Sequence, residues 1–495
     1  MARLVKILLI AVAAIVGIGV IAAAALYLFF DPNDFRDDIS TAVRESTGRE
    51  LTIEGDLSLS VFPWIAVEVG RTSLGNAQGF GDEPFLSFDN ARLSVRLIPL
   101  LLRQDIAIGT ASLDGLVVNL AVAKNGSSNW DDLAAKDTQT TSEPVEGDEA
   151  AGGTLDVANI SVSNARLSYV DAKAGSAVTL SELSVNTGRI AAGSPFDFEA
   201  GFEFLSQPGD LGGKVHISGR TTLEEAFAGL AISGLNVSGS LQGLVEQATE
   251  FNFDAREVSA DLDASRLTLG EMDLSVLGLG VSATVEPFSW EGPTNINAVL
   301  RVAEFSLKEL MQAVGTEPPV TADPNALTKI YFSANATIND QAIELKSMSM
   351  KLDDTTMTGT LSVPLTDAGT IRFDLDADAV NVDAYMAPAD PDPANAGADE
   401  NADIEIPADM IRALNASGKA RLKKATLSGM EFENLQLGLQ SAGGKLRLNP
   451  LSAELFDGTY QGDVRIDASG SVPSLAVNER VDGVSLKSLA RAMFD

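Results

Sequence analysis

The sequence contains no cysteine and a single histidine, His216, among its 495 residues. Without cysteine there is no disulfide, so burial of apolar side chains and backbone pairing must hold the fold together. One histidine cannot make a metal site of histidine and cysteine ligands, and Ser-His or Cys-His catalysis would depend on His216 alone. His216 alternates with Val215 and Ile217 in a strand-like run, which favours a solvent-facing position.

Aromatic residues and positive charges are also scarce. The chain has three Trp and five Tyr, and its 35 Lys and Arg stand against 69 Asp and Glu, a formal net charge of −34. Such a chain repels nucleic acid and anionic head groups at long range, which excludes nucleic acid as a partner. The 45% of hydrophobic residues and the 43 Gly favour many β-strands packed by aliphatic side chains.

Motifs that carry chemistry are missing as well. No phosphate-binding loop, serine elbow or zincin motif is present, and the sequence predicts no enzyme, no cofactor and no metal site. Asp374, Asp376 and Asp378 alternate, so a strand would place all three carboxylates on one face, where oxygen ligands suit Ca²⁺. In so acidic a chain, a solvated acidic face is the main alternative. An enzymatic function therefore has no motif support.

One long apolar run is present at the start of the chain. Ile7–Phe30 holds no charged residue, and as a helix it would be about 36 Å long, enough to cross a hydrocarbon core of about 30 Å. Arg3 and Lys6 precede it, which places the N-terminus in the cytoplasm and the rest of the chain outside. A cleaved signal peptide ending near the small residues 22–24 is the alternative, although the run exceeds a usual signal core.

A short amphipathic helix is predicted directly after this run, over Asn33–Gly48. Phe35, Ile39 and Val43 recur on one helical face. Asn33 is the predicted N-cap, and Gly48 the predicted C-terminal stop.

From Leu51 onward the apolar period changes to two, which predicts strands separated by Gly and Asn turns. The predicted fold is mainly β: an N-terminal transmembrane helix, then a long curled antiparallel β-sheet groove built of repeated modules, with a few short helices. The predicted divisions are a cytoplasmic tip and transmembrane helix (1–30), a helix plus β-module (31–135), an acidic disordered loop (136–153), β-modules (154–314 and 315–386), an acidic Pro-rich linker (387–403) and a C-terminal β-module (404–495).

A helical segment recurs along the chain. FSLKELMQAV at 305–314 matches VSLKSLARAM at 484–493, and 380–386 is a weaker copy. Each copy follows a strand-rich block, which favours helices that close successive β-modules. Chance similarity of amphipathic helices is the alternative. The copy near Asp495 suggests that a further module follows.

The apolar faces of roughly 30–40 short strands must be covered by something. Either the strands close into sandwiches, or they form a trough whose apolar wall meets flexible acyl chains. Packed core is the competing interpretation at every candidate lining position. The candidates are Leu57, Leu59, Val67, Leu437, Leu439, Leu446 and Leu448.

Several motifs in residues 1–135 resemble the AsmA family of Gram-negative envelope proteins, and a looser match covers about 404–495. The first set begins just after the apolar run and continues through the predicted helix and strands. The matching segments are 31–36 (DPNDFR), 47–49 (TGR), 51–57 (LTIEGDL), 62–64 (FPW), 75–80 (GNAQGF), 97–101 (LIPLL), 129–133 (NWDDL), 443–446 (GGKL), 455–460 (LFDGTY) and 483–486 (GVSL).

This resemblance implies a single-pass inner-membrane protein whose bulk lies in the periplasm, with a β-groove related to the bridge-like lipid-transfer proteins. It implies phospholipid and the inner membrane as partners, together with outer-membrane or other envelope proteins. The leading hypothesis is transport of phospholipid between the inner and outer membranes, which would support outer-membrane homeostasis. The alternative is an assembly factor that acts on outer-membrane proteins through exposed strand edges.

Overall fold

The structure is a computed structural model that describes residues 31–60, 64–96, 108–134, 156–224, 228–366, 369–388, 407–485 and 487. The predicted membrane span, Ile7–Phe30, lies outside the described residues. So do the loop 136–153, nearly all of the linker 387–403 and most of the last helical copy, 484–493. In the described part of the chain, no helix is both long and apolar enough to cross a bilayer.

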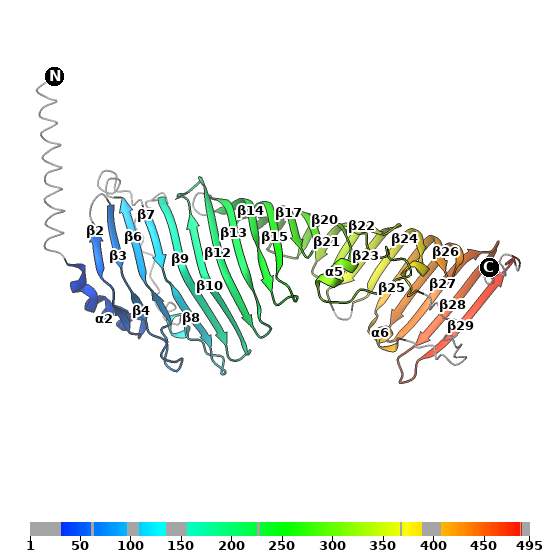
Figure 1. Cartoon of the computed structure of the whole chain (residues 1–495), viewed down its shortest axis with the longest axis horizontal. Coiled ribbons are helices and arrows are strands. Elements are labelled where there is room, and N and C mark those ends of the chain that lie inside the picture. The colour runs from blue at the N-terminus through cyan, green and yellow to red at the C-terminus, as the bar shows by residue number, and fades with distance from the viewer. Residues whose placement is uncertain are drawn as a thin grey trace, which may run out of the picture. The chain divides into compact units, whose positions relative to one another are not determined.

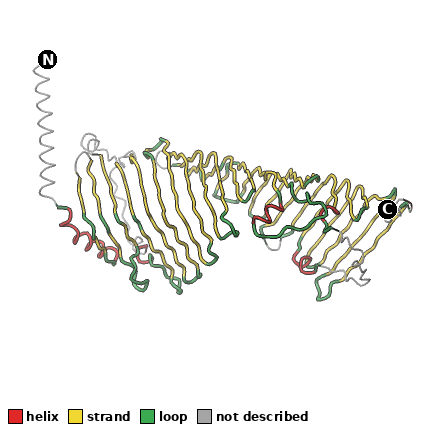
Figure 2. The backbone as a smooth tube through the Cα atoms, in the orientation of Figure 1, coloured by secondary structure: helices red, strands yellow, loops and turns green. Residues whose placement is uncertain are grey.

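The chain divides into two compact units, Met1–Phe251 and Asn252–Asp495. Both are mainly β, and short helices lie beside the strands (Figures 1 and 2). The elements of the first unit are η1 (Pro32–Phe35), α2 (Arg36–Thr47), β1 (Leu51–Ile53), β2 (Leu57–Ser60), β3 (Trp64–Val69), β4 (Thr72–Leu74), β5 (Leu86–Phe88), β6 (Asn90–Arg96), β7 (Ile108–Asp114), β8 (Val117–Val122), α4 (Asp131–Ala134), β9 (Asp156–Asp171), β10 (Ser176–Thr187), β11 (Ile190–Ala191), β12 (Pro195–Gln207), β13 (Leu211–Leu223) and β14 (Gly229–Gln242).

Two rows of short strands meet on the long strand β9 in the first unit. β2, β3, β6 and β7 pair in that order, and β7 runs parallel to the first half of β9. β1, β4, β5 and β8 form the other row, and β8 runs parallel to the second half of β9. From β9 the sheet continues antiparallel through β10, β12, β13 and β14.

A line of irregular residues separates these two rows. The backbones of Gly55 and Gly70 touch, and a Cβ on Gly55 would lie 2.2 Å from the Arg71 nitrogen. Further along the same line, Gly115 and Asn164 adopt positive φ angles of 66° and 53°. Because such irregularities bend a strand and increase its twist, we expect this bulge line to curve the sheet of the first unit. Gly55 therefore lies at a bend between β1 and β2, two strands that pair with β4 and β3 and not with each other.

The predicted helix at 33–48 is present as η1 followed by α2. Gly48 ends it in the left-handed conformation, with φ at 81°, as predicted. The N-cap prediction was wrong: Asp31 caps the helix, since its carboxylate accepts the Asn33 backbone N–H at 2.9 Å. The Asn33 side chain instead accepts the backbone N–H of Leu57 at 2.9 Å and so attaches the helix to β2.

A polar network, in which Arg49 and Asn129 are buried and Asp132 is partly exposed, ties the end of α2 to the start of α4 and the residues before it. The Arg49 guanidinium donates to the Asn129 carbonyl at 2.6 Å and to the Asp132 carboxylate at 3.0 Å. Its side chain is only 2% exposed, and it stacks on Phe85 at 4.5 Å. The Asn129 side chain is fully buried and accepts the Ala121 backbone N–H. This Arg49 network joins two of the motifs that carry the resemblance.

The second unit is a longer meander with one parallel step. Its strands pair antiparallel from β17 through β18, β20 and β21 to β24, then parallel from β24 to β25, then antiparallel to β29. Its elements are β15 (Thr249–Asp261), β16 (Arg266–Thr268), β17 (Gly270–Val276), β18 (Leu279–Val285), β19 (Phe288–Ser289), β20 (Asn295–Phe305), α5 (Leu307–Ala313), β21 (Ile330–Asn339), β22 (Ala342–Leu352), β23 (Thr355–Pro364), β24 (Ile371–Asn381), η3 (Val382–Tyr385), α6 (Ala408–Ala413), β25 (Ala416–Leu427), β26 (Met430–Ala442), β27 (Lys445–Leu455), β28 (Gly458–Asp467) and β29 (Ser474–Asp482).

The prediction of an antiparallel sheet holds for most pairs but not for all. The parallel pairs, β7 and β8 with β9 and β24 with β25, each follow a connection that contains one of the two acidic segments. A parallel neighbour begins at the same end as the strand before it, so each connection has to return along the length of a strand. The acidic composition of the two segments does not by itself predict that the strands on either side of them pair in parallel.

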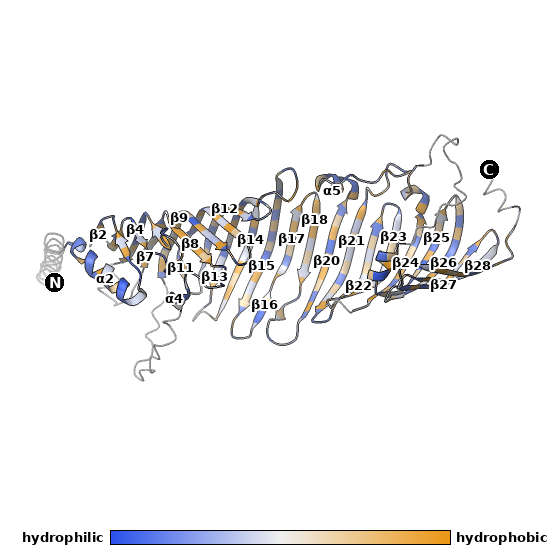
Figure 3. Cartoon of the chain, turned by 90° about the horizontal axis from the view of Figure 1, so that it is seen from below, coloured by the Kyte–Doolittle hydropathy of each residue, from blue (hydrophilic) through white to orange (hydrophobic). Residues whose placement is uncertain are grey.

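Large side chains are largely missing from the buried part of the described structure. Of the 18 buried apolar residues, 11 are Ala. Val157, Ile190 and Phe196 form a small cluster of larger ones. In contrast, 23 large apolar residues are exposed, and hydrophobic positions recur along the strands (Figure 3). The backbone ladders and small residues therefore make the scaffold, and many of the large aliphatic side chains are exposed to solvent.

Candidate functional site

A row of aliphatic side chains crosses the first unit at right angles to its strands. The register pairs Leu59 with Val67, Val67 with Leu93, and Leu93 with Ala111. The parallel pairing of β7 with β9 extends the row to Ile160. Val67 is 48% exposed and Leu93 is 50% exposed. Neighbours on this first aliphatic row thus form a continuous apolar strip without a protein cover over its centre.

The opposite face of the same strands is built differently. Ala66 is 3% exposed and Ser94 is 5% exposed, although each directly neighbours an exposed residue of the row in sequence. The Trp64 ring lies over Gly109 on this side, since a Cβ on Gly109 would be 3.1 Å from the ring. Small residues therefore pack on one face, while the larger aliphatic residues stand on the other.

A second aliphatic row crosses the last strands of the second unit. Leu439 pairs with Leu448, Leu448 with Val464, and Val464 with Val477. Val477 on β29 is 50% exposed. A parallel line passes from Leu446 through Ile466 to Leu475, which is 43% exposed.

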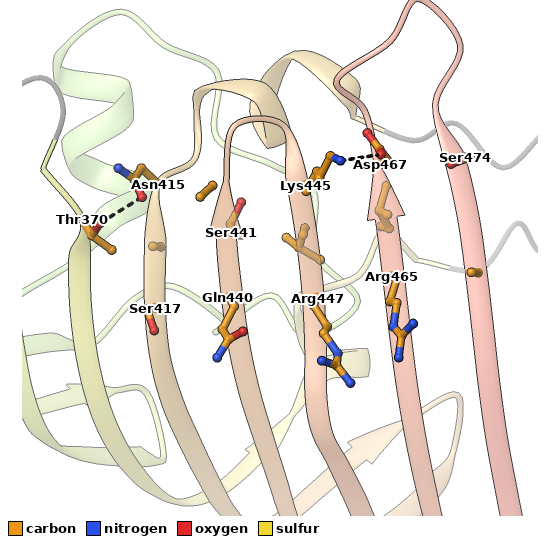
Figure 4. A pocket seen from close by; sticks show the side chains of 15 residues that line it. Thr370, Asn415, Ser417, Gln440, Ser441, Lys445, Arg447, Arg465, Asp467 and Ser474 are labelled. Carbon is orange, nitrogen blue, oxygen red and sulfur yellow. Dashed lines mark hydrogen bonds and ion pairs between the residues drawn. The ribbon is translucent and has the colours of Figure 1, made fainter.

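The reverse face of these strands is polar. Gln440, Arg447 and Arg465 occupy matching positions on β26, β27 and β28 (Figure 4), in a shallow cavity of about 580 Å³. Arg447 and Arg465 both donate to the Asp463 carboxylate. These hydrogen bonds hold the pKa of Asp463 well below its usual range. The aliphatic and charged faces of the sheet are thus sharply separated.

The seven predicted lining residues fall into the two parts of the molecule just described. Leu59 and Val67 lie in the first row, and Leu439 and Leu448 in the second. Leu437 and Leu446 lie beside the second row and are half-buried. Leu57 is only 6% exposed, beside η1, which favours packed core at that position. A role in lining a ligand path stays a prediction for all seven.

The structure adds residues to this set that alternation alone did not single out. Leu93, Leu475, Val477 and Val481 are exposed apolar residues on the same strands or their neighbours. Alternation was visible around each of them in the sequence. Register between strands decides which alternating residues share a row, and a single sequence does not contain that register.

The acidic and histidine candidates are accounted for without a ligand. Asp374 and Asp376 lie on one face as predicted, but Arg421 forms ion pairs with both. The Asp378 carboxylate accepts the Thr356 backbone N–H at 2.8 Å. His216 is exposed. Among the described residues, no group of three or more acidic or histidine side chains is arranged to hold a metal ion.

These features define a class: proteins built on long, mostly antiparallel β-sheets that carry rows of exposed aliphatic side chains on one face. The comparisons with known proteins narrow the class. The sequence model of the AsmA family matches residues 1–495, and the chain belongs to that family. Protein AsmA of Escherichia coli (strain K12) is 39% identical over 97 residues. That match spans 20% of this chain and 15% of the relative. No solved structure matches the chain significantly.

Proposed function

We propose that this chain is a membrane-tethered periplasmic protein that shields phospholipid acyl chains on its aliphatic faces and passes lipid between the inner and outer membranes. Membership of the AsmA family supports a role in the bacterial envelope. The observation that carries the proposal is the pair of exposed aliphatic rows, each backed by a face of small or charged residues.

The energetics favour a flexible apolar ligand. Each methylene that leaves water contributes about 0.8 kcal/mol, so even a partly covered acyl chain binds favourably. The rows consist of Val, Leu and Ile, whose surfaces adapt to chains of varied length and kink. Charged side chains such as Arg447 stand on the reverse face. In this proposal the acyl chains lie on the aliphatic face, and the head group remains in water at the strand ends. No energy source is part of this proposal, and movement along the rows would be passive.

Site-specific photo-crosslinking tests the proposal with pairs of adjacent residues. A benzophenone amino acid is placed at Val67 or Leu448 on the aliphatic face and at Glu68 or Arg447 on the reverse face. The full chain is expressed in Gram-negative cells, irradiated and analysed by mass spectrometry. We expect phospholipid adducts at Val67 and Leu448 and none at their sequence neighbours. Equal labelling of both faces, or no lipid adduct at either aliphatic position, contradicts the proposal.

A second candidate function is assembly of outer-membrane proteins through strand edges, and β29 is the observation that favours it. All nine residues of β29 are exposed, and β28 is its partner among the described strands. An exposed edge of this length is a template for strand addition. Under this alternative, crosslinks from Asn478 on β29 would capture outer-membrane proteins, and deletion of the protein would lower porin levels before lipid asymmetry changes.

A further inference from the structure

A cluster of aromatic and cationic side chains lies at one strand end of the first unit. The Arg96 guanidinium lies 5.5 Å from the centre of the Trp64 ring. Asp156 lies 3.6 Å from Arg96 and accepts two hydrogen bonds from Arg189, at 2.7 and 2.8 Å. Trp64 begins β3, Arg96 ends β6 and Asp156 begins β9. Because β6 runs antiparallel to β3 and β7, and β9 runs parallel to β7, these three residues lie at the same edge of the sheet. We call them, together with Arg189, the Trp64 rim.

The Trp64 rim differs from its surroundings in charge and in exposure. Two arginines against one aspartate give it a net charge of +1 in a chain whose total is −34. The Arg96 side chain is 28% exposed, and its Nε atom is buried without a hydrogen-bond partner among the described residues. Trp64 itself is 38% exposed. It stands on the face opposite Val67, so the rim is separate from the first aliphatic row.

The helix that directly follows the uncharged run in the sequence is bonded to a strand that pairs with β3. The described chain starts at Asp31, and Asn33 is bonded to Leu57 at the start of β2. From Leu57 the strand continues for three residues to Ser60, a rise of about 10 Å. Ser60 pairs with Ala66, two residues from Trp64. Trp64 therefore lies about 17 Å along the strands from Leu57, and η1, which follows the 24-residue uncharged run in the sequence, is bonded to the first residue of β2.

We propose that the Trp64 rim sits in the head-group layer of a phospholipid bilayer, with the Trp64 indole at the interface and Arg96 and Arg189 bound to lipid phosphates. Trp is enriched at this depth because its ring is apolar and its N–H is polar. Arginine pairs with phosphate through its planar fork of donors. The inference rests on the proposed function only in that the chain is held at a phospholipid membrane; it does not require lipid on the aliphatic rows.

Fluorescence quenching by brominated lipids tests the rim. The full chain is reconstituted in vesicles of phosphatidylethanolamine and phosphatidylglycerol, with bromine near the carbonyl end of the acyl chains. Trp130→Phe and Trp290→Phe together leave Trp64 as the reporter. Trp64→Phe and Trp130→Phe together leave Trp290, which is 46% exposed in the second unit, as the control. We expect quenching of Trp64 to exceed that of Trp290 by about twofold or more.

Substitution of the arginines supplies the second measurement. Arg96→Gln with Arg189→Gln should reduce the quenching of Trp64, whereas Arg256→Gln, at an exposed ion pair of the second unit, should not. If the single-tryptophan chain fails to fold, the difference in quenching between the natural chain and its Trp64→Phe variant reports the same quantity. Equal quenching at Trp64 and Trp290 overturns the rim. Lipid adducts at Val67 without quenching at Trp64 reject the rim alone, and quenching without adducts rejects the aliphatic path alone.

Discussion

Two regions of the first unit use polar and apolar side chains in opposite ways. In the Arg49 network a guanidinium that is 2% exposed and an amide that is fully buried hold the chain together. In the first aliphatic row, Val67 and Leu93 are about half exposed. A soluble domain normally has the reverse arrangement, with aliphatic residues inside and polar residues outside. The contrast indicates that the buried polar groups stabilise this unit, so we expect substitutions in the exposed row to change stability little.

The largest expected effect comes from the covered side of β3. Ala66→Asp should lower the free energy of unfolding by about 3 kcal/mol or more, because it places a carboxylate where a residue is 3% exposed. Urea unfolding followed by circular dichroism measures the change. Ala66→Gly, which adds no charge, serves as the control and should cost about 1 kcal/mol.

Arg49→Met is expected to follow, with a loss of about 2–3 kcal/mol. The variant keeps the length of the side chain but leaves the Asn129 carbonyl and the Asp132 carboxylate without their donor. The same urea experiment applies, with Arg44→Met on the exposed side of α2 as the matched control. A loss no larger than that of the control would mean that the network is not a source of stability.

Acidification should weaken the same network. Hydrogen bonds from Arg49 lower the pKa of Asp132 in the folded protein. A lowered folded pKa contributes stability that is complete above the unfolded value of about 4 and disappears as the pH falls through the folded value. The free energy of unfolding should therefore drop between about pH 5 and pH 2, and Asp132→Asn should make that drop shallower. A slope that the Asn variant leaves unchanged would place the acid sensitivity elsewhere.

Val67→Asp should cost only about 1 kcal/mol or less, although it changes the residue next to Ala66. Val67 is 48% exposed, so the new carboxylate keeps much of its hydration. Its effect should instead appear in function, as a loss of phospholipid adducts at Leu93. If Val67→Asp lowered the free energy of unfolding as much as Ala66→Asp does, the row would be covered in solution. The contrast between the first aliphatic row and the Arg49 network would then not hold.

The smallest effect is expected at Arg421. Its two ion pairs with Asp374 and Asp376 are about half exposed, and exposed pairs contribute about 0–1 kcal/mol. Arg421→Gln should therefore leave the unfolding midpoint nearly unchanged and make it less dependent on salt. If calorimetry showed that this variant binds Ca²⁺ tightly, the Arg421 guanidinium would be filling a cation site between Asp374 and Asp376.

Alternation in the sequence was enough to predict strands from Leu51 onward, the helix that ends at Gly48 and the mainly β fold. It also placed Val67 in a strand. The Arg49 network was not predictable, because its partners are about 80 residues apart in sequence and a buried arginine looks like any other charge. The parallel steps and the rows depend on which strands are neighbours, and that information lies in pairing between distant segments rather than in local pattern.

The two parallel connections also affect how many strands can be added to the sheet or removed from it. In a strict meander each strand runs opposite to the one before it. Adding or removing a single strand would therefore reverse the direction of every later strand. The connection before β25 returns the chain to the end from which β24 began, and the connection before β9 returns it past the start of β8 to the level at which β7 began. An ancestor could therefore lengthen or shorten the sheet by an odd number of strands at these two places while every later strand kept its direction and its exposed face.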